Sequence, residues 1–288
     1  MRHAVVGGPT GYIWVLISFL LAAPVPLRAG DLTPEDVIAK HLQSLGSAQV
    51  RAGLKSRVVE GTATYKLLVG WSGQLAGKAG LASEGRKSRI VLKVTAPQYS
   101  GEQLIWDGEK TSVAATYADK TYSDFGDFLK GQDAPLREGL LGGVLVTAWP
   151  LLDVQERKAK LTYQGIKKFE GREFQVIRYR PKKGTDLAIR LYFEPETFRH
   201  AMTTYQVSIQ AGIGANDVES ARQQETQYRI EERFGDFQNS DGLTLPFHYE
   251  LRFTKELQNG FTKLLEWDVA VTRVLNNVSL DPRNFQIK

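Results

Sequence analysis

The sequence FHYELRFT, residues 247–254, alternates without exception between apolar and polar side chains. Strict alternation puts successive side chains on opposite faces of a β-strand, so one face is apolar and the other meets water. Residues 227–234 and 261–272 follow the same pattern, and Glu232 interrupts the apolar side of the first run. Three such strands near the C-terminus predict an antiparallel sheet with a hydrophobic face to cover.

Similar strand patterns occur along most of the preceding chain, and Asp107-Gly108 is a hairpin signal between two of them. The expected fold is α+β: a strongly curved, unclosed, half-barrel-like antiparallel sheet of about 11–12 strands, with helices covering the concave face. The earlier expected strands are 59–69, 73–85, 90–94, 102–106, 110–114, 160–165, 173–180, 187–193 and 200–209.

Helical patterns occur at the start of the mature chain and in an insertion near 123–152. Thr33 and Asp36 match a capping box that begins a helix, and Gly46 ends it. The insertion predicts a short helical turn at 123–130 and a longer helix at 135–152. The latter contains fourteen consecutive uncharged residues, GLLGGVLVTAWPLL (139–152, the central segment). Its glycines weaken a helix, so it is either a movable plug or lid, or an ordinary core helix.

Residues 1–29 have the features of a cleaved secretory signal peptide, with Arg2 before an apolar core at 13–23. That core is shorter than the ~20 residues of a membrane-spanning helix. An uncleaved membrane anchor is the alternative. Residues 30–288 are then expected to form a single domain that contains the insertion near 123–152.

The composition excludes several classes of function. The chain has no cysteine, which rules out disulfides, thiolate chemistry and an N-terminal lipid-modified cysteine. Removal of Arg2 and Arg28 with the signal leaves 35 basic against 32 acidic residues, a balance of +3. This charge is spread too evenly for a nucleic-acid interface.

No motif for catalysis, a cofactor or a metal is found, so we expect neither an enzyme nor a bound cofactor. His41 is expected to pack at a helix edge, and His200 and His248 to be exposed on polar strand faces. Glu266 and Asp268 share a strand face and could serve acid–base chemistry, but a charge ladder with cross-strand arginines is the simpler interpretation. A hydrolase with an unrecognised site remains an alternative.

Two stretches resemble the LolA/LolB-like superfamily of periplasmic lipoprotein carriers. They are the hairpin LIWDGEK at 104–110, and DGLTLP at 241–246 followed by the Trp267 strand and NNVSLD at 276–281 with Phe285. The resemblance covers most of residues 33–288 in outline. It implies an unclosed β-barrel with helices across its mouth that holds acyl chains on its concave face. The insertion near 123–152 departs from the pattern, and the missing cysteine argues against the lipid-anchored branch.

We therefore expect a monomeric, periplasmic, non-enzymatic carrier of a lipid or lipoprotein acyl chain. The alternative is an envelope stress sensor or assembly factor that binds a protein partner, such as an envelope membrane protein. On the carrier hypothesis, Trp149→Asp abolishes ligand capture and leaves the fold intact, whereas loss of folding would mark Trp149 as core. The expected lipid-binding residues are Leu141, Leu145, Trp149, Tyr228, Phe247, Tyr249, Leu251 and Trp267.

Overall fold

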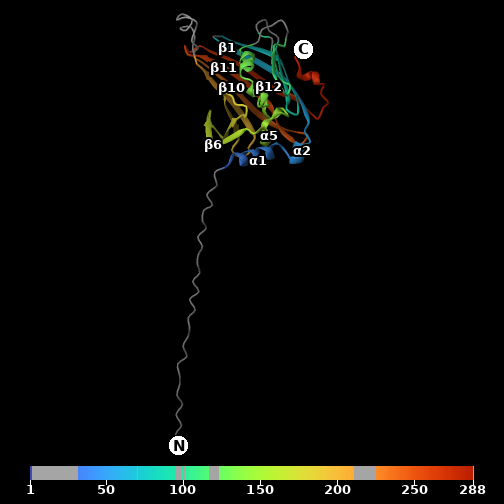
Figure 1. Ribbon diagram of the computed structural model, residues 1–288, viewed down its shortest axis with the longest axis vertical. Helices are drawn as coiled ribbons and strands as arrows, with labels where there is room; N and C mark the ends of the chain where they lie inside the picture. Colours follow the sequence, from blue (N-terminus) through green and yellow to red (C-terminus); the bar gives the residue numbers. More distant parts are fainter. Residues whose placement is uncertain are drawn as a thin grey trace. The chain divides into compact units, whose positions relative to one another are not determined.

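A computed structural model describes Met1 and residues 32–287, apart from 70, 95–98, 100, 117–122 and 211–224 (Figure 1). The fold below is that of the unit Leu32–Lys288. The predicted signal peptide, residues 1–29, lies outside the described residues apart from Met1.

All twelve strands expected from the sequence are present in one antiparallel sheet. Their order is β5-β4-β3-β2-β1-β12-β11-β10-β9-β8-β7-β6, so β5 and β6 form the two edges and the sheet is not closed. The strands are β1 Ser56–Val69, β2 Trp71–Glu84, β3 Lys87–Val94, β4 Glu102–Trp106, β5 Thr111–Ala114, β6 Lys160–Phe169, β7 Arg172–Arg180, β8 Ala188–Phe193, β9 His200–Ile209, β10 Thr226–Ser240, β11 Leu243–Leu257 and β12 Thr262–Asn276.

The alternation that predicts the strands also assigns their faces correctly in the centre of the sheet. Tyr249, Leu251 and Phe253 of β11 are fully buried in the main core, while Glu250 and Arg252 between them lie on the other face. Burying large side chains of this kind contributes roughly 1.5–3 kcal/mol each. The sheet therefore has the single main hydrophobic face that the sequence predicts.

The opposite face carries a charge ladder, as the sequence predicts. Glu266 pairs with Lys66 at 2.8 Å and with Arg252 at 2.9 Å, on strands to either side of β12. Asp268 lies 2.8 Å from His248 Nε2 on β11. The two carboxylates are thus held by cross-strand partners, which is the arrangement expected of a ladder.

The helices are few and short. They are α1 Pro34–Leu45, α2 Ala48–Ala52, α3 Asp124–Gly131, α4 Ala134–Arg137 and α5 Val154–Arg157, with 3₁₀ turns η1 Gly143–Leu145, η2 Pro150–Leu152 and η3 Pro282–Phe285. α1 and α2 lie together at one end of the strands in Figure 1. The predicted capping box of α1 is confirmed: Asp36 N donates to Thr33 Oγ1 at 3.1 Å, and Thr33 N donates to Asp36 Oδ2 at 2.9 Å.

The prediction of a continuous helix over residues 135–152 is wrong. α4 ends at Arg137, and only two isolated 3₁₀ turns follow before Asp153. Gly139, Gly142 and Gly143 have φ values of +66°, +84° and +51°. These left-handed conformations interrupt a right-handed helix, and glycine adopts them at little cost. The glycines therefore do not merely weaken a helix here but replace it with turns.

The prediction that His200 is exposed is also wrong, because its side chain is 1% exposed. Phe193 pairs with His200 and Tyr192 pairs with Met202, so β9 carries one extra residue at this point. Such a bulge reverses the face on which the preceding side chains project. His200 therefore lies in the core, on the same side as Tyr205.

Candidate functional site

The central segment is almost wholly enclosed by the rest of the chain. Every residue from 139 to 152 is buried except Thr147 and Leu152, which are half-buried. The segment belongs to the stretch between β5 and β6, the two edge strands of the sheet. The cavity that borders Val144 and Trp149 has a volume of about 20 Å³, far below the ~300–1,000 Å³ of a small-molecule site. The space beside the segment is therefore too small for an acyl chain while the segment is in place.

Because the central segment is not a regular helix, its backbone groups need other hydrogen-bond partners. Side chains of the sheet supply several of them, across long separations in sequence. Three such bonds connect the segment to β10, β1 and β2: Gly142 N donates to Glu232 Oε1 at 2.7 Å, Arg57 Nη1 donates to the Val144 carbonyl at 2.6 Å, and Thr147 N donates to Ser83 Oγ at 2.8 Å.

Arg157 connects the two parts of the chain that flank the glycine turns of the central segment. Its guanidinium donates to the carbonyls of Glu138 at 3.0 Å and Ala148 at 2.8 Å, and pairs with Asp153 at 2.5 Å. The Glu138 carboxylate in turn accepts a hydrogen bond of 2.9 Å from the Tyr179 hydroxyl of β7. One side chain therefore joins two backbone positions on either side of the glycine turns.

Glu232 is the polar exception on the apolar side of β10, and the structure places its carboxylate in the core. Its side chain has no solvent exposure. Oε1 accepts hydrogen bonds from Gly142 N and from the Tyr249 hydroxyl at 2.8 Å, and Oε2 accepts one from the Tyr205 hydroxyl at 2.6 Å. Burial raises the pKa of Glu232 to about 7, although these hydrogen bonds favour the ionised form. The carboxyl group connects β9, β10 and β11 to the central segment.

This raised pKa predicts a pH-dependent stability that Glu232→Gln removes. Above pH 4.5 the unfolded chain loses this proton, while the folded chain keeps it until about pH 7. The folded state thus binds more protons in that window, so its stability falls as the pH rises through it, by about 3 kcal/mol at most. We expect wild type to lose stability relative to Glu232→Gln between pH 5 and pH 8, measured by urea unfolding. A constant difference between the two proteins would contradict the assignment.

An aromatic and histidine cluster surrounds the other end of the central segment. Trp149 Nε1 donates to His41 Nε2 at 3.1 Å, and His41 Nδ1 lies 3.1 Å from the Phe198 carbonyl, so Nδ1 carries the proton. The Trp149 and His200 ring centroids are 4.4 Å apart. Burial lowers the pKa of His41 to about 4, and that of His200 well below its ordinary value. Both histidines are therefore neutral packing partners of the indole at neutral pH.

The structure brings the sequence-predicted site residues into one apolar core but not into one contact group. Trp149 packs on the histidines, Tyr249 stacks on Phe234 at 5.3 Å, and Trp267 Nε1 donates to the Tyr99 hydroxyl at 2.9 Å. Six of the eight predicted residues are at most 1% exposed, namely Leu141, Leu145, Trp149, Tyr249, Leu251 and Trp267. The other two, Tyr228 and Phe247, are half-buried.

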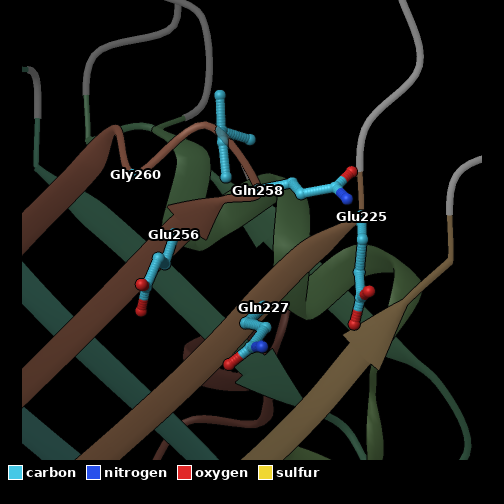
Figure 2. A pocket seen from close by; sticks show the side chains of 6 residues that line it. Glu225, Gln227, Glu256, Gln258 and Gly260 are labelled. Atoms are coloured by element: carbon cyan, nitrogen blue, oxygen red, sulfur yellow. The ribbon is translucent and has the colours of Figure 1, made fainter.

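Two adjoining surface hollows lie where β9 and β11 end and β10 begins. One has a volume of about 210 Å³, and Figure 2 shows Glu225, Gln227 and Glu256 around it. Its neighbour, of about 450 Å³, shares Gln227 and Glu256 and also borders Tyr228 and Arg229. Most of the residues around the two hollows are polar or charged, so neither has the predominantly apolar lining of a typical small-molecule site.

Sequence reasoning missed the residues that hold the central segment, namely Glu232, Arg57, Ser83 and Arg157. Of these four, only Glu232 could have been found in the sequence, because it is a charged residue on the apolar side of a strand.

Within the described ranges, no group of three or more histidine, aspartate or glutamate side chains is placed to hold a metal ion. No helix in the described part of the chain is both long enough and apolar enough to cross a membrane.

Comparison with known proteins yields matches among solved structures only. No protein-family model matches the chain, and no curated protein does. A LolA superfamily protein from Nitrosomonas europaea is 10% identical with a TM-score of 0.43, over 89% of this chain and 99% of that one. An outer membrane lipoprotein-sorting protein domain from Vibrio parahaemolyticus is 10% identical with a TM-score of 0.41, over 86% and 97%.

A DUF1329 family protein from Desulfovibrio piger is 12% identical with a TM-score of 0.40, over 88% of this chain and 96% of that one. The LolA superfamily, which the sequence resembles, is among these matches. At these identities and TM-scores the likeness carries no argument about function.

Proposed function

We propose that this chain is a non-enzymatic periplasmic protein that binds an acyl chain of a lipid or lipoprotein. In this proposal the acyl chain takes the space beside the apolar face of the sheet that the central segment occupies in the structure. The observation that carries the proposal is an uncharged, almost wholly buried segment that forms only isolated turns and is held in addition by side chains of the sheet.

Displacement of the segment would break the hydrogen bonds that connect it to side chains of the sheet. These bonds are few, namely those to Glu232, Arg57 and Ser83. The segment joins the two edge strands, so it stays attached at both ends when it moves.

Burial of the ligand supplies the driving force for the exchange. Each methylene of an acyl chain contributes about 0.8 kcal/mol when it leaves water. A long chain can therefore offset both the lost hydrogen bonds and the exposure of leucines on the displaced segment. The ligand would contact the sheet residues that the segment covers, among them Tyr249 and Leu251, while Leu141, Leu145 and Trp149 would move with the segment.

Export by the segment 1–29 would place the protein in the periplasm. The proposal can be examined there directly by native mass spectrometry of protein purified from its own envelope. We expect a stoichiometric adduct that extracts as lipid. A chain that never carries an adduct, and binds no apolar probe in vitro, would contradict the proposal.

A disulfide between the central segment and β2 is expected to abolish binding. Thr147 N lies 2.8 Å from Ser83 Oγ, so Ser83→Cys with Thr147→Cys introduces the only cysteines of the chain at neighbouring positions. The readout is the fluorescence of N-phenyl-1-naphthylamine, a neutral probe that brightens in apolar sites. We expect wild type to take up the probe and the oxidised double variant to take up at least tenfold less.

The same double variant provides its own control, because a reductant reopens the disulfide without any other change in sequence. Uptake should return to the wild-type level after reduction, and each single cysteine variant should bind normally. Equal uptake by the oxidised and reduced forms would show that the probe binds without movement of the central segment, which would overturn this part of the proposal.

A further inference from the structure

The carboxylate of Glu232 is a fully buried polar group that accepts hydrogen bonds from three donors. It lies between the hydroxyls of Tyr205 and Tyr249, each of which donates to it. Its remaining close donor is the backbone N–H of Gly142, which belongs to the central segment. When the segment leaves, Oε1 loses this donor, while both tyrosines stay in place on β9 and β11.

We infer that Glu232, Tyr205 and Tyr249 form a recognition site for an amide N–H on the ligand, which takes the position that the Gly142 N–H occupies in the structure. The inference rests on the proposed function, because it requires the central segment to give way to the ligand. It adds the chemical class of the ligand: an acyl chain joined through a secondary amide.

The donor requirement follows from the burial of the site. When a buried acceptor loses its donor, the protein bears the full free-energy cost of having removed that acceptor from water. A site built around a hydrogen bond therefore rejects an analogue that has no donor. An amide N–H restores the bond to Oε1. An ester offers no donor, and a free fatty acid would bring a second carboxylate against Glu232.

Two ligands that differ in the N–H donor and in one methyl group test the inference. N-methyldecanamide carries an N–H, and N,N-dimethyldecanamide replaces it with a methyl group. Each is used to displace N-phenyl-1-naphthylamine from the wild-type protein at pH 8, where the carboxyl group of Glu232 is mostly ionised. We expect the secondary amide to displace the probe at an at least tenfold lower concentration. Hydrophobicity alone predicts no advantage for it, since the dimethyl compound has the additional methyl group.

Glu232→Met is expected to remove this preference, because it keeps the length of the side chain and deletes the acceptor. Glu250→Met is the matched control, since Glu250 lies on the opposite face of the sheet and should leave the preference unchanged. If Glu232→Met does not fold, the comparison of the two amides on wild type decides the question by itself.

The outcomes separate this inference from the function on which it rests. Equal displacement by the two amides would overturn the inference and leave acyl binding in place. A preference that persists in folded Glu232→Met would also overturn it. Failure of the wild-type protein to bind the fluorescent probe at all would instead overturn the proposed function.

Discussion

Replacement of Gly139 by alanine is expected to destabilise the fold by about 3 kcal/mol or more. Gly139 has a φ of +66°, which costs a residue with a Cβ about 1–2 kcal/mol. The added methyl group would also overlap the carbonyl oxygen of Ala148 and come within 2.7 Å of the Ala148 Cβ. Arg157 holds that carbonyl at 2.8 Å, so it cannot move away freely. Overpacking of this kind adds about 1–3 kcal/mol. Equilibrium unfolding in urea measures the loss.

The chain offers a matched control at Gly171, in the turn between β6 and β7. Its φ is +83°, but a Cβ added there meets no atom within 4 Å. Gly171→Ala should therefore lose only the backbone term, about 1–2 kcal/mol. Similar losses in the two variants would mean that Gly139 does not pack against Ala148 as the structure shows.

Replacement of Trp149 by aspartate is expected to abolish folding rather than to act on ligand capture alone. The indole is 0% exposed and lies against His41 and His200. Aspartate would leave a cavity and bring an unpaired charge into the core. Removal of a buried Trp costs about 3–5 kcal/mol, and the charge adds to this. The total is comparable with the 5–15 kcal/mol that stabilises a typical domain. Far-UV circular dichroism and gel filtration report the result.

The conservative variant Trp149→Phe separates packing from hydrogen bonding. It keeps most of the apolar volume and removes the N–H that His41 accepts, so we expect a loss of about 1–3 kcal/mol in a chain that still folds. A folded and stable Trp149→Asp protein would contradict the burial of the indole. It would also restore the expectation, drawn from the sequence, that this substitution affects binding alone.

The sheet could be predicted from the sequence because the signal for a strand is local. Alternation along residues 247–254 depends on neighbouring positions only, and the same holds for the hairpin at Asp107-Gly108 and the capping box at Thr33. His200 on β9 is the exception to this pattern, because a local bulge changes its face and the alternation of side chains does not indicate a bulge. One extra residue after His200 shifts its register against β8 and turns the imidazole into the core.

Thus the sequence by itself determined the number of strands, their apolar face and the uncharged nature of the central segment. Only the tertiary structure decided the conformation of that segment and the role of Glu232. The physical reason is distance along the chain: the partners of Gly142, Val144 and Thr147 lie 90, 87 and 64 residues away. Glycine permits many backbone conformations. The choice among them depends on hydrogen bonds that exist only once the strands have come together.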